Sequence, residues 1–473
     1  MQQIDVLPDD VLLEIFDFYG TTMCLLYHDR IPDMAIGSWQ VLVHVCRRWR
    51  NLVFESPLRL NLRLLCNSQK RVKERLNIWP ALPLVVSDSW PVSSNPDNFV
   101  AALAQTNRVC QVNLNLEGWR SAEVLAAMKV PFPELTDLRL FSSHSLAYIS
   151  DSFLGGSAPS LRHISLDRNI VYPELPKLLL STNHLVSLSL ANISHPQYIS
   201  LVAIISVLYS LEALSLRIRY HSLPDWADRS PPPPKRSILP ALKSLHFNGP
   251  TENLEVLVTV IDTPQLDKMY ITTFSFNQIN FGCPLLAHFI NRTPTLRAFN
   301  KARVYFDTSS ASVELVRFSA SRTGLKNLSI DIYVGEPDQQ LPSIERVRNS
   351  SLHPLSTVED LYIEHQYWKL VWENDAIEKL NENALWLQLL LPFTAVKNLY
   401  LSKVFVPGIA AALQELFESK TEVLPSLQNI FLEGLEPSGP VATNIERAVA
   451  TRQISGRPIA IFDWHKDSDS EEI

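Results

Sequence analysis

The sequence is poor in glycine and has few cysteines. Glycine makes up 13 of 473 residues, about 2.7%, against an average of roughly 7%. The chain contains no G-x-G-x-x-G and no G-x-x-x-x-G-K-[ST] segment, which excludes the usual nucleotide-binding loops. The cysteines are odd in number and form no C-x-x-C pair, which favours free, buried thiols in a reducing compartment; they are Cys24, Cys46, Cys66, Cys110 and Cys283.

Secretion and membrane signals are also missing. The first ten residues, MQQIDVLPDD, have no basic segment leading into an apolar core, so we expect no secretory signal. The most apolar stretches, near Leu201–Leu211 and Leu385–Phe393, are too short to span a bilayer. With 46% hydrophobic residues and a net charge of −7, the composition is that of a well-cored globular protein. We expect an intracellular protein, cytoplasmic or nuclear, without a membrane partner.

Catalytic motifs are not apparent. The twelve histidines form no H-E-x-x-H segment and no metal-ligand spacing with cysteine, and no G-x-S-x-G segment occurs. We therefore expect no enzyme, no catalytic residues, no metal site and no cofactor.

One short apolar pattern recurs along most of the chain. The pattern is apolar-x-x-apolar-x-apolar, and its three apolar positions are called anchors below. Twelve copies follow one another in steps of 24 to 38 residues. Their first anchors are Val109, Leu135, Leu161, Leu185, Leu211, Leu242, Leu266, Leu296, Leu325, Val358, Val396 and Leu427.

Each copy predicts a short strand, because its second and third anchors lie two residues apart and point to one face. The stretches between copies suit helices, namely Ile199–Leu208, Leu254–Ile261, Val313–Ala320, Ile377–Leu391 and Ile409–Phe417. This arrangement resembles the leucine-rich repeat. The resemblance implies an α/β solenoid with a curved parallel β-sheet on the concave side and helices on the convex side. Because the asparagine of the repeat is clear only at Asn169, we expect an irregular arc.

Proline is in surplus, with 32 residues. A proline lacks the N–H that a strand or helix interior must donate. We interpret six prolines, each two residues before a first anchor, as stops between one segment and the next; they are Pro133, Pro159, Pro240, Pro264, Pro294 and Pro425.

The apolar residues near the N-terminus have the spacing typical of helices. Leu12, Ile15, Phe16 and Tyr19 fall at i, i+3, i+4 and i+7, and a second helical stretch runs over Trp39–Val53. Helices this short cannot bury all their apolar surface alone. They need a partner surface, in the chain or outside it.

At these residues the sequence resembles an F-box. The matching elements are Leu7-Pro8, the Val11–Phe16 helix, the Val45–Arg50 segment and Ser56-Pro57. The insertion Gly20–Ser38 departs from the family pattern, and we expect it to form a surface loop.

The resemblance implies a substrate receptor of an SCF (Skp–cullin–F-box) ubiquitin ligase. In that role the F-box binds a Skp-type adaptor, and through it a cullin scaffold, while the repeats hold a target protein. The positions that would contact the adaptor are Leu7, Pro8, Leu12, Ile15, Phe16, Val45, Cys46 and Trp49. Two alternatives stay open: these residues pack only as a helical cap on the first repeat, or the chain is a leucine-rich-repeat scaffold with no role in ubiquitination.

These observations predict four segments: an F-box-like helical module over 1–60, a linker and N-terminal cap over 61–100, the solenoid over 101–462 and an acidic disordered tail over 463–473. Residues 47–75 carry nine basic and two acidic side chains. We interpret this cluster as a solvated helical face with some contacts to the adaptor; contact with an acidic partner is the alternative. We expect no nucleic-acid partner, because the whole chain is acidic and no nucleic-acid motif accompanies the cluster.

The residue between the second and third anchors points onto the concave face, where it forms a stripe. The stripe is small and polar in its first half, at Asn113, Arg139, Ser165, Ser189, Ser215 and His246, and aromatic in its second, at Tyr270, Asn300, Ser329, Tyr362, Tyr400 and Phe431. Exposed aromatic side chains anchor protein interfaces. We expect the target to bind Tyr270, Tyr362, Tyr400 and Phe431, with Glu359, Asp360 and Glu364 selecting basic residues on it. Alternatively, these aromatics reflect only the strand preference of their side chains.

Overall fold

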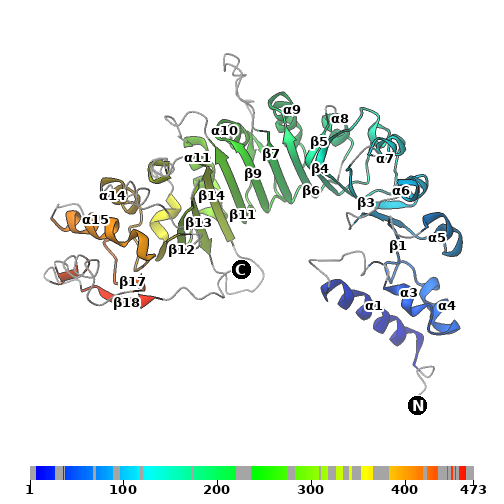
Figure 1. Ribbon diagram of the computed structural model, residues 1–473, viewed down its shortest axis with the longest axis horizontal. Coiled ribbons are helices and arrows are strands. Elements are labelled where there is room, and N and C mark those ends of the chain that lie inside the picture. The colour runs from blue at the N-terminus through cyan, green and yellow to red at the C-terminus, as the bar shows by residue number, and fades with distance from the viewer. Residues whose placement is uncertain are drawn as a thin grey trace. The chain divides into compact units, whose positions relative to one another are not determined.

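In the computed structural model the chain divides into two compact units, Met1–Leu211 and Glu212–Ile473 (Figure 1). The structure describes residues 7–26, 36, 38–67, 71–88, 96–117, 121–172, 175–182, 184–219, 236–274, 283–307, 310–317, 326–333, 340–343, 353–365, 383–418, 423–434, 445, 449–450, 453 and 458–464. None of the helices within these ranges is both long enough and apolar enough to cross a bilayer.

The first unit opens with three helices, α1 (Asp9–Leu26), α3 (Trp39–Leu42) and α4 (Arg47–Glu55). Two expectations need correction. The helix α1 continues past Gly20, so the beginning of the Gly20–Ser38 segment is helical and not a loop; residues 27–35 lie outside the described part. The predicted helix Trp39–Val53 is broken into α3 and α4.

The break occurs at Cys46, whose backbone is extended, with φ −155°. The Cys46 Sγ accepts a hydrogen bond from the Trp49 N–H at 3.4 Å and so caps α4. The Arg50 Nε donates to the Val43 carbonyl at 3.0 Å, which satisfies an acceptor that the broken helix leaves open. Apolar periodicity continues through this corner, and for that reason the sequence pattern did not show the break.

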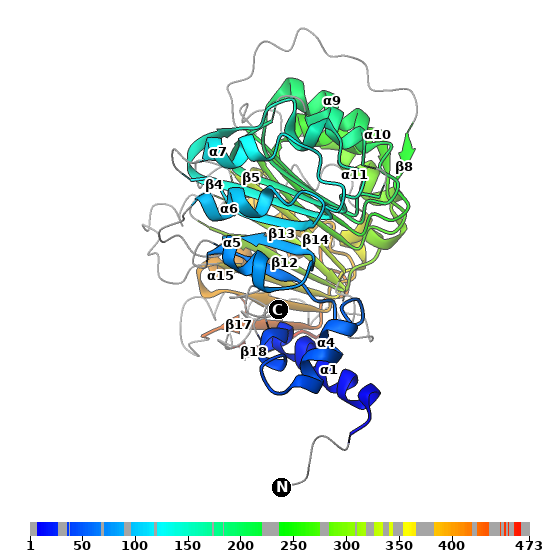
Figure 2. The same ribbon diagram turned by 90° about the vertical axis from the view of Figure 1, so that its right-hand side faces the viewer.

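The remainder of the first unit is a run of parallel strands paired in chain order. The strands are β1 (Leu64–Cys66), β2 (Leu84–Ser87), β3 (Val109–Asn115), β4 (Asp137–Tyr148), β5 (His163–Val171) and β6 (Ser187–Ile193). Helices and one 3-10 turn follow the strands, namely α5 (Val72–Ile78), α6 (Pro96–Leu103), α7 (Ser121–Ala127), η2 (Phe153–Gly156), α8 (Leu175–Leu180) and α9 (His195–Ile205). Figure 2 shows α5, α6 and α7 one above another.

The segment 61–100, expected as a linker and cap, contains two strand–helix units of its own. Leu64 and Cys66 of β1 and Leu62, two residues before them, are buried and spaced two apart. They lack the three-residue step of the other copies, so a search for that pattern does not find them.

The second unit contains ten strands in one spatial order among the described residues. In that order they are β7 (Ala213–Ile218), β9 (Ser244–Pro250), β11 (Lys268–Phe274), β14 (Lys326–Tyr333), β13 (Ser310–Arg317), β12 (Lys301–Phe306), β15 (Asp360–His365), β16 (Asn398–Leu401), β17 (Asn429–Glu433) and β18 (Ala460–Trp464). A separate parallel pair joins β8 (Ser237–Ile238) to β10 (Ile261–Asp262). The helical elements are α10 (Thr251–Val260), α11 (Pro284–Arg292), η3 (Pro294–Leu296), η5 (His353–Thr357), α14 (Asn383–Leu390), η6 (Lys403–Phe405) and α15 (Val406–Glu418).

Three strands of this unit lie in the sheet in the reverse of their order along the chain, as β14, β13 and β12. The strand β13 is antiparallel to both β12 and β14. The neighbouring pairs of β11 with β14 and of β12 with β15 are parallel. The prediction of a helix over Val313–Ala320 is therefore wrong. Buried Ala311, Val313 and Leu315 alternate there with half-buried Ser312 and Glu314, which is the period of a strand.

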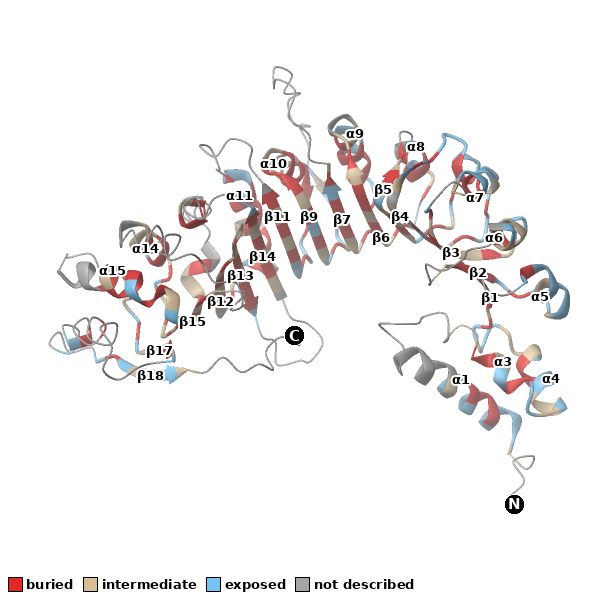
Figure 3. Ribbon diagram, in the orientation of Figure 1, coloured by how far each residue is buried: buried red, intermediate tan, exposed pale blue. Residues whose placement is uncertain are grey.

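The repeat copy that begins at Leu296 does not have its second and third anchors where the sequence pattern predicts them. The pairing of Ala302 with Leu361 shows that Ala302 and Val304 occupy the second and third anchor positions. Arg303, and not Asn300, therefore lies beside Tyr362. In every other copy the second and third anchors are buried within a strand, which confirms the strand predictions (Figure 3).

The six prolines before first anchors each occupy the second position of a turn. The N–H of the first anchor donates to the carbonyl three residues earlier, as from Leu135 to Phe132 at 3.3 Å and from Leu427 to Leu424 at 3.1 Å. The fixed φ of proline suits this position, and its missing N–H leaves no donor unpaired there. The interpretation of these prolines as stops is confirmed, with a turn as the reason.

Replacing a buried anchor should destabilise the fold measurably. Leu245 in β9 is fully buried, so Leu245→Ala should lower the free energy of unfolding by about 2–5 kcal/mol in urea titrations. The matched control is Ser244→Ala on the half-buried position beside it, with an expected change within about 0.5 kcal/mol. Equal effects of the two substitutions would contradict the inward placement of Leu245.

Candidate protein-binding surfaces

The helix α1 has one face inside the first unit and one face on its surface. Leu12 and Phe16 are 1% and 2% exposed. The Phe16 ring packs on Trp49 of α4, with ring centroids 4.7 Å apart. Ile15, by contrast, is 45% exposed. The predicted adaptor residues therefore divide into core and surface.

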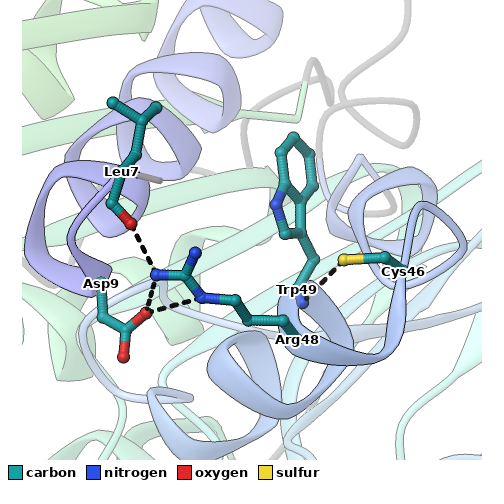
Figure 4. A network of polar contacts seen from close by, with 5 residues as sticks. All are labelled: Leu7, Asp9, Cys46, Arg48 and Trp49. Atoms are coloured by element: carbon teal, nitrogen blue, oxygen red, sulfur yellow. Dashed lines mark hydrogen bonds and ion pairs between the residues drawn. The ribbon is translucent and has the colours of Figure 1, made fainter. Parts of the chain in front are cut away.

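Arg48 of α4 donates hydrogen bonds to the N-terminal end of α1 and to Leu7 just before it (Figure 4). The Arg48 Nη2 donates to the Leu7 carbonyl and to Asp9 Oδ1, each at 2.6 Å, and the Nε donates to the same Asp9 oxygen at 3.1 Å. Asp9 also lies in the first turn of α1, where a carboxylate is favoured by the helix dipole. These contacts fix the Leu7-Pro8 segment against the second half of the module.

Four residues on the outer face of α1 form what we call the α1 stripe: Pro8, Val11, Ile15 and Phe18. Steps of three and four residues place them on one side of the helix, and all four are exposed. Val41 and Val45, which flank the α3–α4 corner, are exposed as well.

Of the predicted adaptor residues, the structure places Pro8, Ile15 and Val45 at the surface, and Leu7, Cys46 and Trp49 half-buried. Leu12 and Phe16 belong to the core of the unit. Val11 and Phe18 were missed, although their spacing from Ile15 in the sequence marks the same face.

Several basic side chains of the cluster over 47–75 form ion pairs or hydrogen bonds within the first unit. Arg59 pairs with Glu14 at 2.5 Å, and Arg71 pairs with Glu74 at 3.0 Å. Arg75 donates to the Leu65 carbonyl. Arg59 thus connects its segment to α1 and Arg75 connects α5 to β1, whereas the Arg71–Glu74 pair lies exposed at the start of α5.

On the second unit, residues between the second and third anchors form continuous rows because strand pairing keeps their register. The row formed by Tyr362, Tyr400, Phe431 and Phe462 is called the aromatic row. Successive rings stack at centroid distances of 4.0, 4.4 and 5.1 Å, with interplanar angles of 0°, 9° and 21°. The prediction thus correctly grouped three of its four aromatics.

The fourth aromatic, Tyr270, lies elsewhere. It packs on His246, with ring centroids 4.4 Å apart. The reversed strands place Ser329, Glu314 and Arg303 between it and Tyr362. The sequence pattern already placed two residues between Tyr270 and Tyr362, and the antiparallel strand β13 adds a third, Glu314.

Two cations and an indole surround the first ring of the aromatic row. The Lys301 Nζ lies 4.1 Å from the centroid of the Tyr362 ring, and the Arg303 guanidinium carbon lies 5.7 Å from it. Trp464 meets Tyr362 and Tyr400 edge-on, at 6.1 and 5.6 Å. Burial, and then the neighbouring Tyr400, raises the pKa of Tyr362, so this hydroxyl stays protonated at neutral pH.

The three acids expected to select a basic target have contacts within the chain. Glu359 pairs with Lys397 at 2.9 Å. Asp360 accepts a hydrogen bond from Asn398 at 2.7 Å, and Glu364 is buried. Glu359 is exposed despite its ion pair, Asp360 is half-buried like the Tyr362, Tyr400 and Phe431 rings, and Glu364 is the one of the three acids that the fold buries.

Sequence reasoning missed Phe462 and Trp464 on the same face. Their spacing of two residues is that of one strand face. The repeat pattern does not find this strand, because Asp463 occupies the position of its third apolar anchor.

The described cysteines Cys46, Cys66, Cys110 and Cys283 are free thiols. Burial raises the pKa of Cys66 to about 11 and raises that of Cys283 as well. Neither is therefore an activated thiolate at neutral pH. Within the described residues, no group of three His, Cys, Asp or Glu side chains is placed to hold a metal ion.

The arrangement is a mixed α/β fold of mostly parallel strands with helices between them. It is leucine-rich-repeat-like.

No family model matches the chain, and no curated protein matches it in sequence. Among solved structures, the chain is similar to the leucine-rich repeat-containing protein LegL7 from Legionella pneumophila, with 15% identity and a TM-score of 0.27 over 76% of this chain and 95% of that chain.

The stacked pair Tyr362 and Tyr400 should show energetic coupling. In a double-mutant cycle with Tyr362→Ala and Tyr400→Ala, we expect a coupling free energy of about 0.5–1.5 kcal/mol from denaturant unfolding. Tyr362→Ala combined with Tyr333→Ala is the control, because Tyr333 is exposed on β14 and outside the aromatic row. Additive effects in both cycles would contradict a contribution of stacking to stability.

Proposed function

We propose that this chain is the substrate-recognition subunit of an SCF-type ubiquitin ligase. In this proposal the module 1–60 is an F-box that docks a Skp-type adaptor and, through it, a cullin scaffold. The aromatic row on the second unit holds the target protein. The chain performs no bond chemistry, needs no cofactor and acts inside the cell.

The observation that carries the proposal is the α1 stripe. A module with a closed core, built on the Phe16–Trp49 contact, still leaves Val11, Ile15 and Phe18 exposed on one helix face. Contiguous exposed apolar side chains are costly in water and are typical of protein-binding sites. The stripe begins at Leu7-Pro8, the same residues that carry the F-box resemblance, and Arg48 fixes them in place.

The second surface supports the target-binding half of the proposal. Stacked aromatic rings present a large, rigid area whose side chains lose little entropy on binding. The Tyr362–Tyr400 pair is held at 4.0 Å by strand pairing, so this part of the surface is organised before any target arrives.

A leucine-rich-repeat scaffold without a role in ubiquitination is the alternative, because the aromatic row serves a scaffold equally well. The two functions differ in one outcome. Removing an SCF receptor from the cell stabilises its target, whereas removing a scaffold leaves the target's lifetime unchanged.

Adaptor binding should depend on the α1 stripe. Ile15→Glu places a charge on the stripe without entering the core, so it should weaken capture of a purified Skp-type adaptor by about tenfold or more. The matched control is Val130→Glu, since Val130 is also 45% exposed but lies outside the helical module.

Adaptor capture is measured by co-purification and by surface plasmon resonance. Thermal unfolding of both variants shows whether they keep their fold. If Ile15→Glu retains the affinity of the unchanged chain, or if the unchanged chain binds no adaptor, the SCF proposal is wrong.

Target capture should depend on the aromatic row. The double variant Tyr362→Ala, Tyr400→Ala should lose most of the partners that co-purify with the second unit's surface, because two stacked rings are removed together. Tyr333→Ala removes an exposed tyrosine elsewhere on the same unit and should lose none. Quantitative mass spectrometry of the captured proteins is the measurement, and equal capture by all three chains would exclude the row as the target site.

A further inference from the structure

The last strand of the second unit, β18, is attached in a different way from its neighbours. At the positions where β17 buries Ile430 and Leu432, each 2% exposed, β18 carries half-buried Ile461 and exposed Asp463. One strand thus has two buried anchors and its neighbour has none. Ile459, directly before β18, is buried, but within β18 itself no side chain is buried.

The apolar contacts of β18 lie on the other face. Phe462 stacks on Phe431 as the last ring of the aromatic row, and it is 45% exposed. Trp464 extends back over the row to within 5.6 Å of Tyr400 and 6.1 Å of Tyr362. The side chains of β18 therefore cover part of the surface that a target would use.

These two observations together describe a strand that is easily displaced. The stability of an element against local opening follows from the apolar surface it buries. The strand β18 has one paired neighbour, β17, joined over five residue positions, and it stands last in the strand order of the described residues. Its opening exposes one edge of β17 and uncovers Tyr400 and Tyr362.

We propose that β18 is an internal occupant of the surface formed by Tyr362, Tyr400 and Phe431, the part of the aromatic row outside β18, and that a target segment of the same chemistry replaces it. That segment is extended, pairs with β17 and carries two aromatic residues two positions apart. This proposal rests on the proposed function in taking the aromatic row as the target surface.

The spacing of the aromatics follows from strand geometry. Residues two apart share one face of a strand, as Phe462 and Trp464 do. Addition of a strand to an exposed sheet edge gives affinity through main-chain hydrogen bonds, while alternate side chains give selectivity. A segment with adjacent aromatics would place one ring on the row and the other on the opposite face.

The experiment uses the full chain and a labelled synthetic peptide with the sequence of residues 458–465, PIAIFDWH. The peptide should bind the variant Phe462→Ala, Trp464→Ala about tenfold or more tightly than the unchanged chain, because the variant's own strand no longer covers the row. Adding Tyr400→Ala should abolish that gain. A control peptide with Phe and Trp adjacent should bind neither chain. Fluorescence anisotropy gives the affinities.

Hydrogen exchange provides the second measurement. Amides of β18 should exchange faster than those of β16 in the unchanged chain, and faster still in the double variant. Exchange of β18 as slow as that of β16, or peptide binding no tighter to the double variant, would overturn the proposal. A dimer that dissociates on Phe462→Ala, Trp464→Ala would also overturn it, since a second copy would then be the occupant. The assay contains no adaptor, so its result is independent of the SCF proposal.

Discussion

Parallel pairing of strands in constant register is the constraint on which the rest of the structure depends. Each strand offers two faces, and register decides which residues become neighbours on each. On the inner face, anchors such as Leu361 and Leu399 meet and are fully buried. On the outer face, the same pairing brings Tyr362 against Tyr400. One set of main-chain hydrogen bonds thus produces both the core and the candidate binding surface.

The reversed hairpin modifies this pattern at one place. Because β13 runs antiparallel between β14 and β12, it introduces Glu314 between Ser329 and Arg303 in the row that leads from Tyr270 to Tyr362. Arg303 and Lys301 lie over the Tyr362 ring and close that end of the aromatic row. The other end is formed by β18, whose side chains belong more to the surface than to the core. One end of the aromatic row is therefore bounded by the cations Lys301 and Arg303, and the other end by β18, in which no side chain is buried.

The helical module follows a different principle. Short helices bury too little surface for their size, so the module depends on a few specific contacts: the Phe16–Trp49 ring pair, the Arg48 hydrogen bonds and the Cys46 cap. These contacts use one face of α1 completely. The opposite face leaves Val11, Ile15 and Phe18 exposed, and it is the surface on which the proposed function rests.

The sequence by itself determined the repeat, the anchors and the role of the prolines, because burial at spacings of two and three residues is a local property of a strand and the turn before it. It also identified Tyr362, Tyr400 and Phe431 as outward residues. Only the tertiary structure decided that an extra strand carrying Glu314 lies between Tyr270 and Tyr362, that Arg303 replaces Asn300, and that Phe462 completes the row with Trp464 edge-on against it. Those facts depend on which strands pair and in which order. Strand order is set by contacts between residues far apart in the chain, which no local pattern contains.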